Sequence, residues 1–349
     1  MKALVTGATG FIGGAIARHL LGRGDEVHVL ARDPGRARTL EGARVHAGSI
    51  LDPNAILAAA RGVDVVFHAA GIASPRASAR ALRWAFVAGT ENVLSAARAA
   101  SCERVVMISC ADVTLSNQDR VHWDEKRDLS APPVGERARA LKLAEEIALS
   151  VSDDALPVCA LRGTWVWGPG DTTTLPGLIA EARSGGVRMV GPGKTLVATT
   201  HVDHLVEAAL AAARSPRIAG QAYYVADGEF LELREFLGAM LDTLRLPPPR
   251  HGSALALAYP LAQLRRGDDP LACPEEVLRR GRSTLFDINK AIADLDFRPH
   301  ITIDAGMKAL ARWVEAQGGL DAVAALKRPL PDERVLEREI HDAQRAAAG

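Results

Sequence analysis

Short apolar, β-branched runs alternate along the chain with amphipathic segments of roughly 10–15 residues. This alternation is typical of βαβ units and predicts a parallel sheet. The predicted strands cover Lys2–Thr6, Glu26–Ala31, Ala43–Ala47, Val63–His68, Arg104–Ser109, Val158–Arg162 and Ala222–Ala226. The predicted helices between them cover Phe11–Arg23, Asn54–Arg61, Thr90–Ala100 and Ala138–Ser150. We therefore expect an α/β fold built on a Rossmann-type doubly wound parallel sheet.

The second half of the chain is less regular. Pro247–Pro249 interrupt the pattern, and residues 250–282 mix Ala- and Leu-rich helical stretches with charged sequence, as in a substrate-side lid. The expected organisation is an NADP-binding Rossmann domain (1–170 plus 196–226), a smaller C-terminal substrate-binding lid domain (171–195 plus 227–315) and a helical tail (316–349). The charged end of this tail, Glu333–Gly349, is expected to fray.

Composition and charge exclude several classes of function. The 349 residues contain 42 Lys+Arg and 42 Asp+Glu, so there is no basic surface for nucleic acid. No stretch approaches the ~20 apolar residues of a membrane span, and the chain enters its first strand at once, which leaves no room for a signal peptide. The four cysteines have no metal-binding spacing. We expect a cytoplasmic enzyme with reduced thiols, no metal, no nucleic acid and no membrane partner.

Glycines follow the first predicted strand at a regular spacing. Residues 6–13 read Thr-Gly-Ala-Thr-Gly-Phe-Ile-Gly and open the first predicted helix. Gly7 permits a tight turn, Gly10 lets backbone N–H groups approach a pyrophosphate, and Gly13 lets the helix pack closely on the sheet. The helix N-terminus adds positive potential. The segment therefore predicts dinucleotide binding.

The end of the second predicted strand bears on the choice of dinucleotide. An NAD site usually presents a carboxylate there, whereas this strand ends at Ala31 and is followed by Arg32. A guanidinium can hold a 2′-phosphate, and Arg36 and Arg38 are possible second contacts. The alternative is a solvated turn in which Asp33 pairs with Arg32. The sequence favours NADPH/NADP, with NADH possible.

The chain resembles the extended short-chain dehydrogenases/reductases at residues 6–14, 68–71 (HAAG), 87–93 (VAGTENV) and 161–171 (LRGTWVWGPGD). Residues 222–229 (AYYVADGE) are similar to the hydroxysteroid-dehydrogenase branch, and the resemblance extends to about residue 315. It implies a Rossmann fold and an NAD(P) cofactor. The implied cofactor contacts are Gly7, Thr9, Gly10, Phe11, Ile12, Gly13, Arg32, Ser49, Ile50, Ala69, Ala70, Gly71, Lys142, Gly163 and Thr164.

The catalytic positions implied by the resemblance are largely replaced. The family pattern places a proton-donating Tyr four residues before a Lys, with a Ser and an Asn nearby. Lys142 stands at the lysine position, where it would bind the nicotinamide ribose and add positive charge. The tyrosine position is Ala138, the asparagine position is Phe86, and the serine position is Cys110 unless a shift of one residue restores Ser109.

Three hypotheses follow from the missing proton donor. The protein is a non-catalytic NADP-binding regulator, or another group (Asp112, Cys110, His122 or one beside Trp165) is the acid, or the substrate supplies its own proton. The tyrosines Tyr223, Tyr224 and Tyr259 are expected to be out of reach. Acid–base catalysis contributes on the order of 10²–10⁴-fold. A well-aligned intramolecular donor, with an effective molarity of about 10⁵ M or more, can replace it. We favour the third hypothesis.

A phenolic hydroxyl beside a ring ketone is such a donor. The chain is similar to atypical family members that lack the Ser and Tyr and reduce angucyclinones, which implies a small-molecule aromatic polyketide ketone in antibiotic biosynthesis. A steroid or 3-oxoacyl ketone with a substitute acid is the other expectation. Phe86, Trp165 and Trp167 are candidate substrate contacts, although core packing is equally expected of Trp167. The protein is expected to be a monomer or homodimer.

Overall fold

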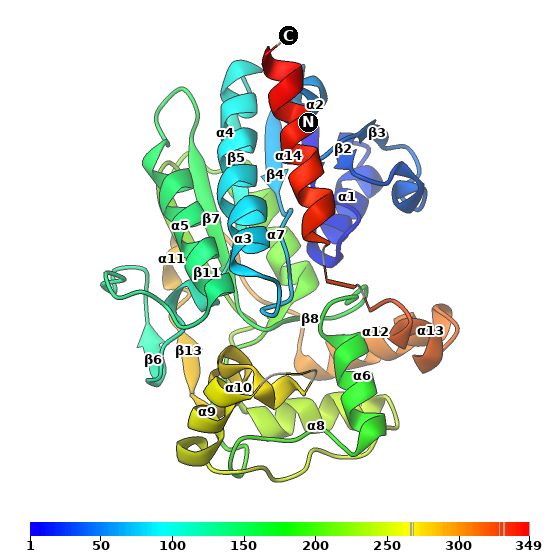
Figure 1. Cartoon of the computed structure of the whole chain (residues 1–349), viewed down its shortest axis with the longest axis vertical. Helices are drawn as coiled ribbons and strands as arrows, with labels where there is room; N and C mark the ends of the chain where they lie inside the picture. Colours follow the sequence, from blue (N-terminus) through cyan, green and yellow to red (C-terminus); the bar gives the residue numbers. More distant parts are fainter. Residues whose placement is uncertain (266, 268, 328, 331, 349) are drawn as a thin grey trace.

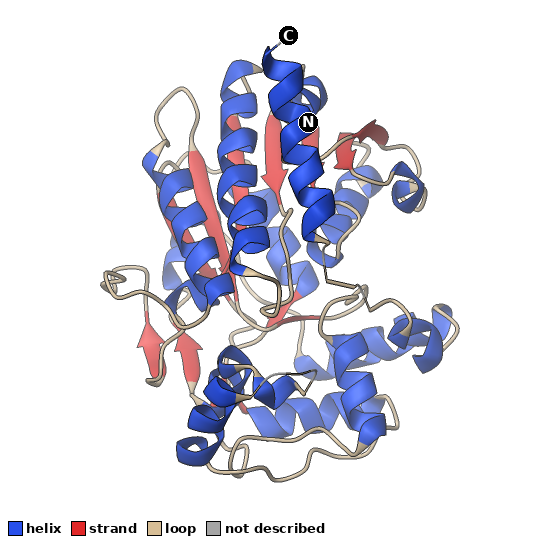
Figure 2. Cartoon of the chain, viewed as in Figure 1, coloured by secondary structure: helices blue, strands red, loops and turns tan. Residues whose placement is uncertain are grey.

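A computed structural model describes residues 1–265, 267, 269–327, 329–330 and 332–348. Residues 266 and 268 of the predicted lid, and 328, 331 and 349 of the predicted tail, lie outside the described residues. The chain forms a larger α/β half that contains the N-terminus and a smaller half built from later segments (Figures 1 and 2).

The larger half is organised around a seven-stranded sheet in which every pair of neighbours is parallel. Its order is β11-β7-β5-β4-β1-β2-β3. The strands are β1 (Lys2–Thr6), β2 (Glu26–Ala31), β3 (Arg44–Ala47), β4 (Val65–His68), β5 (Arg104–Cys110), β7 (Val158–Gly163) and β11 (Gln221–Val225). The chain reverses direction across the sheet between β1 and β4, which is where doubly wound folds bind their ligands. The predicted fold class is confirmed.

Helices cover both faces of this sheet because its strands are apolar on both faces. Val5 and Val29 belong to the core on one face, whereas Leu4 and Leu30 belong to the core on the other. The first face carries α1 (Phe11–Gly22), α7 (Val202–Ala212) and α11 (Asn289–Leu295), and the second carries α2 (Pro53–Ala60), α4 (Gly89–Ala99) and α5 (Glu136–Ser150).

A longer helical run than predicted leads into α4. Ser78 caps α3 (Ala79–Arg83), the backbone then forms a π-helical turn at Trp84–Ala88, and α4 follows without a break. Such wider turns are rare and occur often at functional sites. This one carries Phe86, whose ring packs on Gly71 after β4.

The smaller half contains a mixed four-stranded sheet, β12-β9-β13-β6, and a two-stranded sheet, β10-β8. Its strands are β6 (Arg120–Trp123), β8 (Val166–Trp167), β9 (Leu196–Val197), β10 (Thr200–His201), β12 (Leu231–Glu232) and β13 (Thr284–Phe286). Its helices are α6 (Leu175–Ser184), α8 (Leu233–Thr243), α9 (Leu255–Leu264), α10 (Pro274–Gly281), α12 (Ile303–Ala316) and α13 (Leu320–Ala324). Short 3₁₀ turns follow β2 (η1, Pro34–Ala37) and β5 (η3, Ala111–Thr114) of the larger sheet, and another precedes α10 (η4, Pro270–Ala272).

The C-terminal helix α14 (Glu333–Ala348) returns to the larger half and lies beside α3 and α4 (Figure 1). Leu336 and Ile340 pack on Leu51, Ala81 and Trp84. The helix expected at this end is present, but it is docked by these apolar contacts. In the part of the chain described here, no helix is both long enough and apolar enough to cross a membrane.

Candidate active site

The turn between β1 and α1 is built from glycines that no other residue fits. Gly7 has φ +72°, and a Cβ there would lie 2.6 Å from the Ala69 carbonyl oxygen and 2.7 Å from the Ala70 nitrogen. A Cβ at Gly13 would lie 2.4 Å from the Gly7 oxygen. Gly10 caps α1 through its backbone alone, and the first turn of α1 carries no acidic residue. The N-terminus of α1 is therefore suited to an anionic ligand, as a pyrophosphate cradle requires.

The neighbouring residues of this turn differ in what they can offer a cofactor. The side chain of Phe11 is buried in the core, and Ile12 packs against the same core, so both would contact a cofactor through the backbone. Thr9 lies in the turn itself. Ala69, Ala70 and Gly71 form the facing loop after β4, close against Gly7.

Arg32 directly follows the carboxyl end of β2 and is exposed. Asp33 is engaged elsewhere, because its carboxylate accepts the Gly35 N–H at 3.0 Å and caps η1. Arg36 and Arg38 are exposed on the same segment. Arg32, Arg36 and Arg38 are therefore three exposed arginines within the seven residues that follow β2.

The loop after β3 carries Ser49 and Ile50, and α14 lies against it. The Ser49 hydroxyl donates to the Glu339 carboxylate at 2.6 Å, and Ile50 packs on the cluster formed by Leu336. The sequence reasoning missed this contact, since nothing local links residues 290 positions apart. The C-terminal helix therefore reaches the predicted cofactor site.

The tyrosine position is occupied by a methyl group in a packed apolar environment. Ala138 is 0% exposed and lies in a cluster with Leu115 and Leu278, against which Tyr259 also packs. This corrects the expectation that all three tyrosines are remote, because α9 brings Tyr259 to this cluster from the lid. Four residues on, Lys142 pairs with Glu146.

Ser109, the alternative to Cys110 at the serine position, is held in a buried network. Its hydroxyl donates to Glu145, which forms a buried ion pair with Arg162 behind the strand ends. Ser109 is thus committed to this internal network, and Cys110 follows it at the strand end. Burial raises the pKa of the Cys110 thiol, so the thiol stays protonated near neutral pH.

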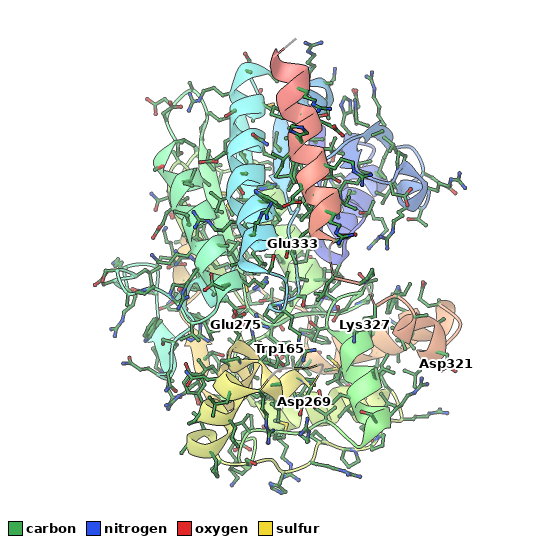
Figure 3. The ribbon with its side chains drawn as sticks, viewed as in Figure 1. Trp165, Asp269, Glu275, Asp321, Lys327 and Glu333 are labelled. Atoms are coloured by element: carbon green, nitrogen blue, oxygen red, sulfur yellow. The ribbon has the colours of Figure 1, made fainter. Side chains whose placement is uncertain are left out.

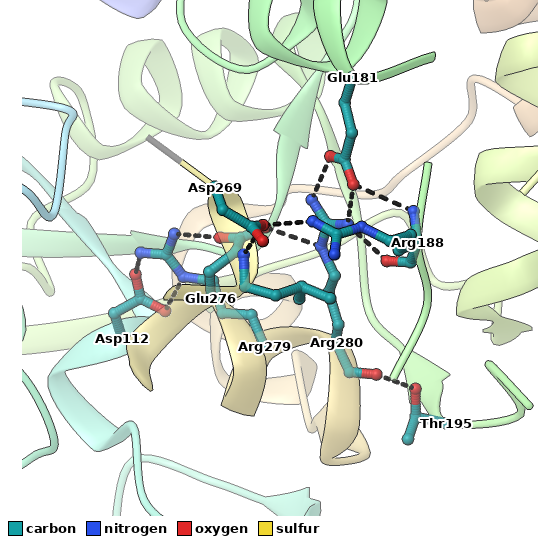
Figure 4. Close-up of polar contacts among 9 residues, drawn as sticks. Asp112, Glu181, Arg188, Thr195, Asp269, Glu276, Arg279 and Arg280 are labelled. Atoms are coloured by element: carbon teal, nitrogen blue, oxygen red, sulfur yellow. Dashed lines mark hydrogen bonds and ion pairs between the residues drawn. The ribbon is translucent and has the colours of Figure 1, made fainter. Parts of the chain in front are cut away.

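Asp112 lies in η3 between two guanidinium groups. Arg137 of α5 donates to it at 3.1 Å, and Arg279 of α10 pairs with it from the lid (Figure 4). Burial opposes its ionisation, but these two charges outweigh burial and hold the pKa of Asp112 well below its usual range. An ionised carboxylate cannot donate a proton, so this geometry opposes the predicted acid role. His122, also considered as an acid, is exposed on β6.

The same ion network continues through the lid and ties its elements together. Arg279 also contacts Glu276, Glu276 contacts Arg280, and Arg280 forms a buried pair with Glu181 of α6 (Figure 4). The i,i+3 and i,i+4 spacing of the α10 residues is visible in the sequence, but their partners on η3 and α6 are not. This network is the largest feature of the site that sequence reasoning missed.

The remaining predicted site residues lie at the end of β7 and directly after it. Gly163 and Thr164 are buried, and the Thr164 N–H bonds to Thr200 at 2.9 Å. Trp165 has φ +34°, a strained conformation for a non-glycine residue, and lies where the two halves meet (Figure 3). Trp167 is 1% exposed and donates to Asp227 at 2.9 Å, which assigns it to the core of the smaller half.

His201, which packs on Trp167, and His204 of α7 are both buried. The His204 ring bonds to Asp227 at 2.7 Å and accepts the N–H groups of His300 and Ile301 at 2.9 Å. Both ring nitrogens are therefore used for structure. Within the described residues no group of three or more His, Cys, Asp or Glu side chains is placed to hold a metal.

This chain is similar in sequence to a known protein family and to several known enzymes. The NAD dependent epimerase/dehydratase family matches residues 3–226. A 2-alkyl-3-oxoalkanoate reductase of Stenotrophomonas maltophilia (strain K279a) is 33% identical over 334 residues, covering 89% of this chain and 98% of the relative. A 4-hydroxy-2-methyl-3-oxo-4-farnesyl-3,4-dihydroquinoline-1-oxide ketoreductase of Stigmatella aurantiaca is 30% identical over 321 residues, covering 89% and 96%.

Two matches at lower sequence identity are a steroid dehydrogenase and a solved structure that contains NAD. A 3-beta-hydroxysteroid dehydrogenase of Mycolicibacterium neoaurum is 27% identical over 93% of this chain and 96% of its own. The structure of MoeE5 in complex with UDP-glucose and NAD superposes with a TM-score of 0.72 at 26% identity, covering 91% of this chain and all of that one. These findings favour an enzyme over a silent regulator. The chain belongs to the NAD dependent epimerase/dehydratase family of extended short-chain dehydrogenases/reductases and is an NAD(P)-dependent oxidoreductase.

Proposed function

We propose that this enzyme reduces a ring ketone of a polycyclic aromatic polyketide of the angucyclinone class to a secondary alcohol. In this reaction NADPH is the reductant, and a hydroxyl group next to the ketone on the substrate provides the proton. The enzyme would act in the cytoplasm, in antibiotic biosynthesis. The observation that carries the proposal is the buried methyl group of Ala138, packed under Leu115 and Leu278 where the family has its phenol.

The chemistry of the surrounding side chains supports a proton from the substrate. Reduced nicotinamide, when bound, supplies a hydride to the carbonyl carbon, and the carbonyl oxygen then needs a proton. Asp112 is ionised between its arginines, and the buried Cys110 thiol has a raised pKa. A hydroxyl already hydrogen-bonded to the ketone meets the need, because its effective molarity reaches about 10⁵ M or more.

The glycine turn would hold the pyrophosphate, and Lys142 would turn from Glu146 to the nicotinamide ribose and add positive charge near the developing oxyanion. Trp165, at the boundary with the lid, offers an aromatic surface for a planar ring system. Phe86, fixed against Gly71, would limit the space beside the cofactor loop.

A relative supports the substrate class. The name of the Stigmatella enzyme's substrate places a 3-oxo group beside a 4-hydroxy group on a bicyclic quinoline. That hydroxyl is on a saturated carbon that also bears the farnesyl group, so it is a tertiary alcohol beside the ketone, similar in position to the proposed donor but not a phenol. The chain also resembles the simocyclinone 7-ketoreductase, an atypical extended reductase without the Ser-Tyr pair.

The proposal is tested with a matched pair of substrates, a ring ketone with a neighbouring phenolic hydroxyl and its O-methyl ether. We expect NADPH oxidation at 340 nm to be faster for the hydroxy ketone by on the order of 10²-fold, because only it contains the intramolecular donor. Equal kcat/KM values for the pair would refute substrate-assisted protonation.

A second candidate substrate is a 3-oxoacyl or steroid ketone, which the names of the Stenotrophomonas and Mycolicibacterium relatives favour. The same assay decides between the two. A long-chain 3-oxoalkanoate or a 3-oxosteroid with a kcat/KM above that of the hydroxy ketone would replace the aromatic substrate in the proposal.

The preference for NADPH rests on Arg32. Substituting Arg32→Ala removes up to two charge-assisted hydrogen bonds to a 2′-phosphate, so the ratio of NADPH to NADH affinity should fall by about 10-fold or more. Fluorescence titration of both cofactors measures the ratio. Arg23→Ala, at the opposite end of α1, is the matched control and should leave it unchanged. An unaltered ratio in Arg32→Ala would exclude this residue as the determinant.

A further inference from the structure

One face of the lid helix α10 lies on the positions that the resemblance identifies as catalytic. Glu275, Leu278 and Arg279 have i, i+3, i+4 spacing and so share this face. Leu278 packs on Ala138, and Arg279 pairs with Asp112, two residues after Cys110. Glu275 lies against Gly135, one helical turn of about 5 Å before Ala138 on α5.

The Glu275 side chain of α10 packs tightly against Gly135, the residue that caps the start of α5. Gly135 has φ +96° and caps α5 without a side-chain hydrogen bond, and a Cβ there would overlap the Glu275 carboxyl group. Glu275 is 3% exposed, and its Oε2 has no hydrogen-bond partner among the described residues. A buried carboxyl oxygen without a partner is costly, which favours the neutral, protonated form or a ligand that bonds to it.

The charges around Glu275 come from three elements. Arg279 belongs to its own helix, Arg137 to α5, and Asp112 to η3, while Arg137 also donates its backbone N–H. Burial is the largest influence, the two arginines oppose it, and Asp112 adds to it. The result raises the pKa of Glu275 to about 7. Near neutral pH a substantial fraction of Glu275 is therefore a neutral acid.

We propose that Glu275 is the protein's own proton donor at this site, giving the enzyme a second, slower activity on ring ketones that lack a neighbouring hydroxyl. The inference rests on the proposed ketone reduction and extends its substrate range. The carbonyl carbon accepts a hydride, the C=O π bond breaks, and its oxygen takes the proton from the Glu275 carboxyl. Glu275 is left as a carboxylate and regains a proton from water.

The other groups near Ala138 fit this role less well. Asp112 is fixed as a carboxylate by two arginines. Tyr259 packs on the Ala138 cluster from α9 and is only partly buried. Glu275 combines burial, an unpartnered oxygen and a place beside the vacated position.

The test compares wild-type enzyme with Glu275→Gln on the same pair of ketones. Glutamine keeps an oxygen to accept the Arg137 N–H but has no acidic proton. Turnover of the O-methyl ether should fall by on the order of 10²-fold. Turnover of the hydroxy ketone should change by less than ~3-fold, because its donor is intramolecular. In wild-type enzyme, ether reduction should decline as pH rises through about 7, where Glu275 loses its proton.

Two further measurements separate an acid from a structural residue. Tyr259→Phe, which removes only a hydroxyl from the same cluster, should reduce the ether normally. Infrared difference spectra of the protein without cofactor should show a protonated-carboxyl band that titrates near pH 7 and is absent in Glu275→Gln.

The results that would contradict the inference differ from the result that would contradict the proposed function. Wild-type enzyme that reduces the hydroxy ketone but not the ether, or a Glu275→Gln enzyme that reduces the ether normally, overturns the inference and leaves the proposed function intact. Loss of ether turnover in Tyr259→Phe instead would assign the proton to that phenol and also overturn it. Wild-type enzyme that reduces neither ketone overturns the proposed function.

Discussion

Replacing Glu145 with alanine is expected to lower the free energy of unfolding by about 3–5 kcal/mol. Glu145 and Arg162 are 3% and 4% exposed, with the Arg162 Nε 3.0 Å from the Glu145 Oε1. The Ser109 hydroxyl donates to the other carboxylate oxygen. Removing the carboxylate leaves the Arg162 charge buried and uncompensated, which is the costly half of a buried ion pair.

Urea denaturation followed by circular dichroism measures this effect, and the adjacent residue gives the control. Glu146 pairs with Lys142 at the surface, and its side chain is 55% exposed. Glu146→Ala should cost at most about 1 kcal/mol, as exposed ion pairs do. Equal losses for the two alanine variants would show that the Glu145–Arg162 pair is not the internal support that its burial indicates.

Replacing Gly13 with alanine should destabilise the protein by about 1–3 kcal/mol and weaken NADPH binding at least ~10-fold. The new Cβ would lie 2.4 Å from the Gly7 oxygen and 2.6 Å from the Gly7 carbonyl carbon. Both contacts are with backbone atoms of the turn that cradles the pyrophosphate. The turn must shift, and the backbone N–H groups shift with it.

Gly22, at the other end of α1, is the matched control for this substitution. A Cβ at Gly22 meets nothing within 4 Å, so Gly22→Ala should keep NADPH affinity and leave stability unchanged or raised by up to about 1 kcal/mol. Thermal unfolding and NADPH fluorescence titration measure both effects. A Gly13→Ala protein with normal NADPH affinity would show that close helix packing is not what shapes this turn.

The sequence predicted the seven strands of the larger half and four of its helices, because each of these elements has a local signal, whereas α3, α7 and α11 were not predicted. The strands of the seven-stranded sheet are short apolar runs between helices, and the Gly7–Gly13 spacing locates the switch point of the sheet. The smaller half has no comparable signal. β8, β9, β10 and β12 are two residues long, too short for any period, and exist only because distant segments pair with them.

The sequence predicts those features of the site that depend on a single residue. It does not predict the contacts between residues that are far apart in the chain. A missing tyrosine is visible at Ala138 alone. The contact of Ser49 with Glu339 joins residues far apart in the sequence, and so does the pairing of Asp112 with Arg279. Tyr259 reaches Ala138 only because α9 folds over it. The adjacent glutamates Glu275 and Glu276 were read as part of a charged lid, although one is buried against α5.

The central claim is that the proton for the hydroxy ketone comes from the substrate and not from a side chain. The most direct measurement is single-turnover NADPH oxidation with that ketone in a Cys110→Ala/Glu275→Gln double variant, which retains no acidic proton at either position. We predict a rate that differs from wild type by less than ~3-fold, because the intramolecular donor remains. A loss on the order of 10²-fold, with NADPH binding intact, would mean that the protein protonates the alkoxide itself.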